Sequence, residues 1–227
     1  MIIWVILFLL IVGTSFVLAY RSMVDYKEIP RRQEADYGLY LVRKSSGLTW
    51  EFLDSVRAKL LSTGGVLSLE RLFKDRKTVL CLFGPKNILK DLMGELRLLE
   101  LEDYTAGISY ENMDIWEVGT KGSGETLENT DNIFAALPKL YKEDQFFWQV
   151  ALGDKRVQIR AAIFSNDTRR RKIFANWFEN LAPGVLIKVP RPYSNEQMFD
   201  FFRLRSLGRD TEIPVLGSKV VMRLLKI

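Results

Sequence analysis

Histidine is absent from the 227 residues of this chain. Its absence excludes Ser-His-Asp and Cys-His catalysis, in which an imidazole serves as the general base. It also removes the side chain that most often binds zinc, iron and copper. The sequence therefore predicts a protein that is not an enzyme and that uses no metal or other cofactor.

Cysteine is almost absent too, because Cys81 is the single one. A lone cysteine forms no intrachain disulfide, so an oxidising compartment gains no support. Cys81 alternates with Val79 and Phe83, and we expect it to point inward as a small hydrophobic side chain. The formal net charge is +5, which suits an anionic membrane surface and is too weak by itself to indicate nucleic acid.

The first twenty residues carry no charged side chain and form an apolar run, in which Gly13, Thr14 and Ser15 are small or weakly polar. About 20 apolar residues at ~1.5 Å each cover a hydrocarbon core of ~30 Å. A cleaved signal peptide is the weaker alternative, because no basic side chain precedes the run and residues 18–20 are a poor cleavage site. A buried core helix is weaker still, since no face is polar. The sequence predicts a transmembrane anchor over residues 1–20.

Basic residues follow this run and none precede it: Arg21, Lys27, Arg31 and Arg32. The positive-inside rule then predicts a single-pass protein of the inner membrane, with its N-terminus outside and the rest of the chain in the cytoplasm. Residues 21–36 would be a juxtamembrane linker. Its basic side chains would either contact lipid head groups or be solvated and only set the topology.

A first folded unit is expected over residues 37–110, in the order β-α-β-β-α-β. Strands are predicted at residues 39–43, 66–73 and 78–83, with a weaker one at 101–105. Thr49 is a helix cap, and Gly64-Gly65 would end that helix. A second helix is expected after Pro85, with apolar positions from 88 to 99.

The same order is predicted again over residues 111–190. Strands are expected at residues 114–118, 145–152, 156–164 and 185–189, with helices near 129–137 and after Asn166-Asp167. Two such units predict an α+β fold of two tandem ferredoxin-like (βαββαβ) units, either in one continuous sheet or in two packed sheets. The alternative is a single mixed α+β domain whose elements alternate by chance.

Residues 191–227 form a predicted C-terminal extension. Ser194 is a good helix start, and residues 213–216 and 220–225 predict short strands. The extension would add to the sheet or serve as a docking element.

A glycine-rich segment from Gly119 to Thr126 nearly fits a phosphate-binding loop. Glu125 stands where that loop carries its lysine, and a carboxylate there would repel phosphate. We therefore expect a plain strand-to-helix loop.

The densest basic run is Arg169, Arg170, Arg171 and Lys172. It lies at the start of a predicted helix, where cations are unfavourable, so these side chains are candidates for contact with an anionic lipid, nucleic acid or an acidic partner. A solvated helix face is the alternative. The strand order is also that of RNA-recognition modules, but the aromatic pattern of those modules is missing; Phe146, Phe147 and Trp148 would instead pack against the neighbouring unit.

Several segments resemble one family: residues 128–137 (ENTDNIFAAL), 147–152 (FWQVAL), 191–193 (RPY) and 198–201 (MFDF). They are similar to membrane-anchored proteins encoded beside VirB-type ATPases in bacterial conjugation and type IV secretion clusters. The resemblance covers the second unit and the extension best. It implies one anchor followed by tandem ferredoxin-like units, a scaffolding role toward the ATPase, and no catalytic residues.

Together these observations predict a single-pass, membrane-anchored cytoplasmic scaffold that positions a partner in a membrane machine such as a type IV secretion or conjugation apparatus. Its expected partners are the lipid bilayer and a protein, either the conjugation-type ATPase or a second copy. The alternative function is a membrane-tethered module that binds nucleic acid or anionic lipid through residues 169–172.

Overall fold

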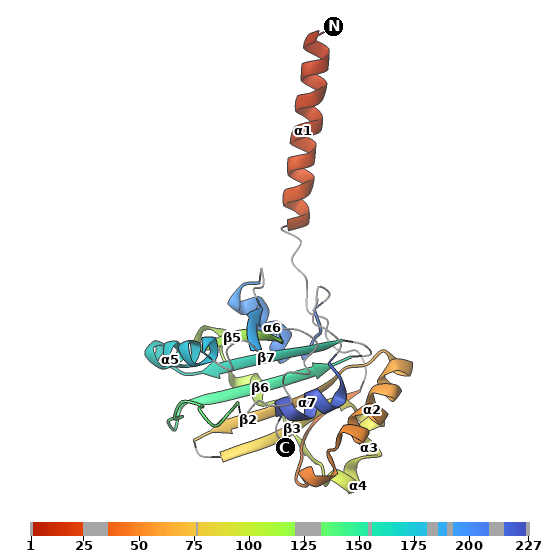
Figure 1. The fold of residues 1–227 in the computed structure, drawn as a ribbon, viewed down its shortest axis with the longest axis vertical. Helices are drawn as coiled ribbons and strands as arrows, with labels where there is room; N and C mark the ends of the chain where they lie inside the picture. The colour runs from red at the N-terminus through yellow and green to blue at the C-terminus, as the bar shows by residue number, and fades with distance from the viewer. Residues whose placement is uncertain are drawn as a thin grey trace.

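The computed structural model describes residues 2–24, 36–75, 77–120, 133–153, 156–180, 186–189, 193–208 and 216–225. Its centre is one eight-stranded antiparallel sheet with the strand order β4-β1-β3-β2-β6-β7-β5-β8 (Figure 1). The strands are β1 (Tyr37–Leu41), β2 (Leu67–Lys74), β3 (Lys77–Pro85), β4 (Leu99–Leu101), β5 (Met113–Thr120), β6 (Gln145–Leu152), β7 (Val157–Phe164) and β8 (Leu186–Val189).

The two halves of the sheet repeat one arrangement. Across the sheet, the first half has the order β4-β1-β3-β2 and the second half has the order β6-β7-β5-β8. Each half thus places its four strands in the same relative order, and the second half runs across the sheet in the opposite direction. The halves meet where β2 pairs with β6, from Leu67 opposite Leu152 to Lys74 opposite Gln145. Because this pairing is an unbroken antiparallel ladder, the halves share one continuous sheet. The sequence had left that choice open.

Capping residues define both ends of α2 (Trp50–Thr63), the first long helix that packs on the sheet. The Thr49 side chain accepts a hydrogen bond from the backbone N–H of Phe52, which satisfies one of the free donors at the helix start. Gly64 ends the helix in the left-handed conformation at φ 67°, which glycine adopts without steric cost. In the second half, α5 (Thr168–Glu179) is capped in the same way by Asp167.

The single helix expected after Pro85 is instead two short ones, α3 (Lys86–Lys90) and α4 (Met93–Leu96). The fourth strand is also earlier than predicted, at Leu99–Leu101. It ends there because the Asp103 side chain accepts a hydrogen bond from the N–H of Thr105 and turns the chain into the 3-10 helix η2 (Tyr104–Gly107). Two further 3-10 turns are η1 (Ser45–Gly47) and η3 (Tyr110–Asn112).

The C-terminal extension covers the sheet on both faces and adds no described strand. A capping box between Ser194 and Gln197 starts α6 (Asn195–Arg203), which packs on Met113, Ile115 and Phe147. The last element is α7 (Ser218–Leu225), so the strand predicted over residues 220–225 is wrong. Val221, Leu224 and Leu225 are the buried positions. Their spacing of three and four follows a helical period, which a window of six residues did not distinguish from strand alternation.

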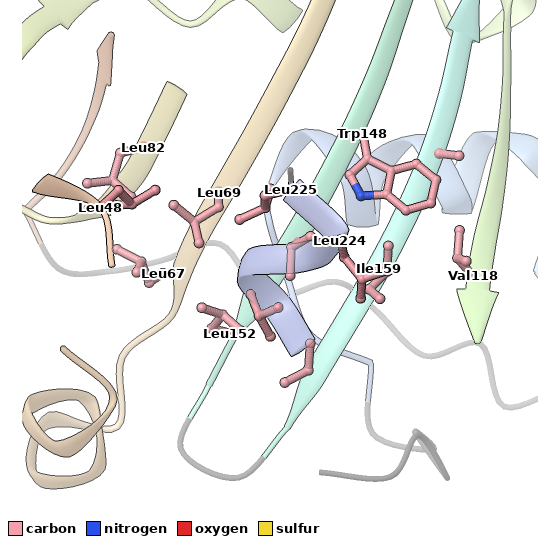
Figure 2. Close-up of a cluster of buried hydrophobic side chains, with 14 of the residues drawn as sticks. Leu48, Leu67, Leu69, Leu82, Val118, Trp148, Leu152, Ile159, Leu224 and Leu225 are labelled. Atoms are coloured by element: carbon pink, nitrogen blue, oxygen red, sulfur yellow. The ribbon is translucent and has the colours of Figure 1, made fainter. Parts of the chain in front are cut away.

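Helix α7 lies across the middle of the sheet, on the face that also carries α2 and α5 (Figure 1). Leu224 and Leu225 point into the core among Leu69, Leu152 and Ile159, which come from β2, β6 and β7 (Figure 2). Arg57 of α2 donates a hydrogen bond to the carbonyl of Leu216 at 2.8 Å, and Arg71 of β2 donates one to the carbonyl of Leu225 at 2.8 Å. The C-terminal helix therefore spans the junction between the two halves.

The N-terminal helix α1 (Ile2–Val24) stands clear of the sheet (Figure 1). Among the helices that the structure describes, none combines the length and the apolar character needed to cross a membrane.

This finding overturns the transmembrane anchor expected over residues 1–20, and with it that part of the predicted fold class. It also removes the support for a single-pass inner-membrane protein with its N-terminus outside. The orientation had depended on Arg21, Lys27, Arg31 and Arg32, whose side chains lie outside the described part of the structure.

Candidate functional site: a buried polar row and two exposed surfaces

A row of polar side chains crosses five adjacent strands on the face of the sheet that α6 covers. Strand register places Glu70 opposite both Cys81 and Gln149, Gln149 opposite Arg160, and Arg160 opposite Glu117. Paired residues in an antiparallel sheet point to the same face, so the row is continuous from β3 to β5. All of its members are at most 2% exposed.

Arg205 reaches this row from just beyond the end of α6. Its backbone is left-handed, with φ 50°, which turns the side chain down onto the sheet. Its Nε lies 3.0 Å from Glu70 Oε1, and its Nη1 lies 2.6 Å from Asp103 Oδ2. The guanidinium also lies over the rings of Phe83 and Tyr104, at 4.8 and 5.4 Å from their centroids. One residue of the extension thus joins two acidic groups of the first half.

The Glu70 carboxylate accepts hydrogen bonds from every side of this cluster. Ser68 donates to Oε1 at 2.8 Å, Gln149 donates to Oε1 at 3.1 Å, and the Tyr104 hydroxyl donates to Oε2 at 2.5 Å. Burial and the Glu70 charge raise the pKa of Tyr104 well above its usual value, so its hydroxyl stays protonated and remains a donor.

Charge pairing also shifts the pKa values of Arg205 and Asp103. Burial alone would lower the pKa of Arg205, but the charge of Glu70 and the hydrogen bonds to Asp103 outweigh it and raise that pKa. Burial would likewise raise the pKa of Asp103, and the hydrogen bond and charge of Arg205 lower it instead. Both shifts favour the charged forms of Arg205 and Asp103, which pair directly with each other.

Arg160 binds the extension at the second-half end of the row. It donates to the side chain of Gln149 at 2.8 Å, to the carbonyl of Phe201 at 3.2 Å, and to the carbonyl of Ser206. Gln158 continues the network by donating to Glu117 at 3.0 Å. Since these side chains are buried and hydrogen-bonded to one another and to the extension, the row fixes the extension on the sheet.

Sequence reasoning missed this network. It singled out neither Glu70 nor Arg205. One signal was present: Gln158 and Arg160 are polar residues two apart in an otherwise apolar strand, so they share one face. That face had to be either solvated or covered by something polar.

Cys81 is buried in this row, which confirms the expectation that it points inward. Burial, together with the nearby Glu70 charge, raises the pKa of its thiol to about 12. The thiolate is the reactive form, so Cys81 is inert in the folded chain.

The structure separates the members of the basic run at the start of α5. Arg169 and Lys172 are exposed. Arg170 instead pairs with the buried Asp144 at 3.1 Å and lies 4.3 Å above the ring of Tyr141. Arg171 lies 3.5 Å from Asp114 and donates to the carbonyl of Ser165 at 2.6 Å. Two of the four candidates thus hold α5 to the body, and anion contact remains a prediction that depends on the other two.

The three adjacent aromatic residues of β6 are all buried. Phe146 and Trp148 lie in the core under α5 and α7, and Phe147 lies on the opposite face. There its ring stacks on Tyr104 at 5.4 Å and meets Phe202 of α6 edge-on at 5.6 Å. A base could not stack on Phe147 while α6 is in place. The glycine-rich segment at Gly119–Thr126 lies outside the described residues beyond Thr120.

The second exposed surface is α1. Its described apolar side chains stand open, with Trp4 74%, Phe8 65% and Phe16 75% exposed. One side of the helix is hollowed around Gly13, and the hollow is lined by Leu9, Leu10, Gly13, Thr14, Val17 and Leu18. Exposed apolar surfaces of this kind are typical of protein and membrane interaction sites.

Within the described residues, no group of three or more Cys, Asp or Glu side chains is placed to hold a metal ion. Comparison of the chain with protein-family models, with curated proteins and with solved structures found no match. The resemblance to conjugation-cluster proteins therefore stays a prediction from the sequence.

Proposed function

We propose that this chain is a non-enzymatic interaction protein: a rigid platform, made of one fused sheet, that presents α1 to a protein partner. The observation that carries this proposal is the exposed apolar surface of α1. Burying an exposed Leu, Ile or Phe side chain is worth about 1.5–3 kcal/mol, so a surface of many such residues favours a bound state.

The platform is built to move as one body. The β2–β6 ladder joins the halves, α7 covers the junction from one face, and Arg205 ties the extension to the first half on the other face. A rigid body holds its binding elements at fixed positions, which is what a scaffold requires.

The partner class comes from the sequence resemblance. If that resemblance reflects common descent, the platform would position the ATPase of a secretion or conjugation apparatus. The proposal of a scaffold does not depend on this identification, because the exposed surface of α1 calls for a partner in any case.

Site-specific photo-crosslinking tests the proposal. A photoreactive amino acid at Phe16 of the full chain should give a protein adduct of discrete mass in native cells. The same amino acid at the exposed Asn176 of α5 is the matched control and should give none. An absence of protein adducts from Phe16, or adducts to lipid alone, would contradict the proposal.

A further inference from the structure

The start of β3 is an open strand edge. Strand β1 pairs with residues 81–85 of β3, and the N–H of Val42 donates one further bond to the carbonyl of Leu80 at 2.9 Å. The chain then leaves β3, because the N–H of Lys44 bonds to the carbonyl of Leu96 at 3.0 Å instead. Among the described residues, no strand therefore pairs with residues 77–79 on the side away from β2. This edge lies at the opposite end of β3 from α2 and α3 (Figure 1).

Thr78 provides the backbone groups of this edge. Alternate residues of an antiparallel strand direct both their N–H and their C=O to the same neighbouring strand. Leu80 directs its carbonyl to the β1 side, so Thr78, two residues earlier, directs its N–H and C=O to that side as well. Backbone groups placed in this way are a template for an added strand. Such a strand would also cover Val79, whose side chain is 39% exposed.

Basic side chains surround the open edge. Four of them are exposed, and none forms an ion pair with another described residue: Arg43, Lys44, Lys74 and Lys77. Lys74 and Lys77 lie directly opposite each other in the β2–β3 pairing. Like charges in this position are unfavourable, and a carboxylate beside them would relieve the repulsion. The edge is therefore complementary to an acidic segment.

A hollow beside Thr78 can take a side chain of the added strand. Its volume is about 280 Å³, and its lining is Phe73, Asp75, Lys77, Thr78 and residues 137–140. This volume is below the ~300–1,000 Å³ of small-molecule pockets, so it suits one side chain better than a separate ligand. A residue opposite Thr78 points to the same face of the sheet as Thr78 does. Because Phe73 and residues 137, 138 and 140 are apolar, an apolar residue fits that position.

Charge also decides against a second copy of this chain at the edge. A second copy would bring its own four exposed cations to the same place, and Asp75 offsets only part of that charge. Like charges opposite each other in a sheet repel. A partner strand with carboxylates has the opposite balance, and its acidic side chains next to the apolar one would lie on the face of Lys74 and Lys77.

We propose that the edge of β3 from Lys77 to Leu80 binds an extended acidic segment of a partner protein as an added strand. An apolar residue of that segment lies opposite Thr78, and acidic residues on both sides of it lie beside the basic side chains. This surface is separate from α1, so the inference goes beyond the proposed function and does not depend on it.

Peptide binding to the full chain in mild detergent, measured by fluorescence anisotropy, tests the proposal. The probe is a labelled nine-residue peptide with Glu at every second position, Val at the others and Leu at the centre. We expect its affinity to fall about tenfold or more when each Glu is replaced by Lys. An equal loss is expected when the amides that face the edge are N-methylated. N-methylation removes hydrogen-bond donors and leaves the charge unchanged, so it separates strand addition from charge attraction.

Substitutions in the chain locate the site. Thr78→Pro removes the N–H that faces the open side and no bond to β2, because an edge position tolerates proline. It should weaken binding about tenfold or more, whereas Thr78→Val keeps the donor and should stay within about twofold. Lys77→Glu should also weaken binding about tenfold or more. Lys90→Glu is the matched control, because it makes the same charge change at an exposed residue of α3. Urea denaturation checks that each variant is folded.

The absence of saturable binding by the acidic peptide would overturn the proposal. Equal binding of the N-methylated peptide, or equal losses in the Lys77 and Lys90 variants, would show general attraction to a basic chain and would overturn it as well. A single-stranded oligonucleotide that displaces the peptide, and whose own binding is unaffected by Thr78→Pro, would assign these cations to nucleic acid and overturn the added strand.

Discussion

Glu70 and Arg205 are 135 positions apart in the sequence, yet their side chains form an ion pair at 3.0 Å that is 1% exposed on each side. The pair joins a strand at the centre of the sheet to the segment that follows α6. Removing one partner of a buried ion pair leaves the other charge without compensation.

Arg205→Met should therefore lower the free energy of unfolding by about 3–5 kcal/mol, measured by urea denaturation. Adding Glu70→Leu to that variant should recover a large part of the loss, because the stranded carboxylate is removed. Arg203→Ala is the control: its pair with Asp200 is exposed, and we expect a change within about 0.5 kcal/mol. Equal losses of unfolding free energy in the two arginine variants would show that the buried ion pair stabilises the fold no more than the exposed one.

Acid should weaken the same cluster through Asp103. Its pKa is lowered in the fold because the hydrogen bond and charge of Arg205 outweigh the effect of burial. A carboxyl whose folded pKa is depressed stabilises the fold above its unfolded pKa of about 3.9, and that contribution is lost as the pH falls through the folded pKa. The difference in unfolding free energy between the wild type and Asp103→Asn should thus be largest near neutral pH and shrink below about pH 4. A difference that stays constant from pH 7 to pH 3 would refute this origin.

The C-terminal helix should be needed for the stability of both halves. Leu224 is 2% exposed in the core that β2, β6 and β7 share. Leu224→Ala should lower the free energy of unfolding by about 2–5 kcal/mol. Leu61→Ala removes the same atoms from a side chain that is 54% exposed and should change it by about 0.5 kcal/mol or less. If the Leu224 variant were as mild as the Leu61 variant, α7 would not be part of the core.

The basic run should divide into structural and free members. Arg170→Ala leaves the carboxylate of Asp144, which is 4% exposed, without its ion pair, and should cost about 1–3 kcal/mol of stability. Arg169→Ala should leave stability unchanged. If the run binds polyanions, the Arg169 and Lys172 variants should weaken that binding and flatten its salt dependence without unfolding the chain. Binding to nucleic acid that is unaffected by both substitutions would remove this surface as a candidate.

Local signals in the sequence predicted the elements that local chemistry controls. Thr49 and Gly64 mark the ends of α2, and Asp167 marks the start of α5, because caps act within a few residues. The early end of β4 was missed, because it depends on a single hydrogen bond that the Asp103 side chain accepts from the N–H of Thr105. Residues 220–225 were predicted as a strand because these six apolar and basic residues fit both the helical and the strand period. Only their packing in the core that the two halves share distinguishes the two structures.

The buried polar row could not be predicted from one sequence. Its members come from five strands and from the segment after α6, and nothing near Glu70 in the chain points to a partner 135 positions away. The predicted anchor failed for a different reason. It was drawn from residue types alone, and among the described helices none has the length and apolar character needed to cross a membrane.

The central claim is that the exposed apolar side of α1 is covered by protein. Photo-crosslinking from Phe16, whose side chain is 75% exposed, measures this directly. We expect a discrete protein adduct at Phe16 and none at Asn176. Adducts at both positions alike, or no protein adduct at Phe16, would contradict it.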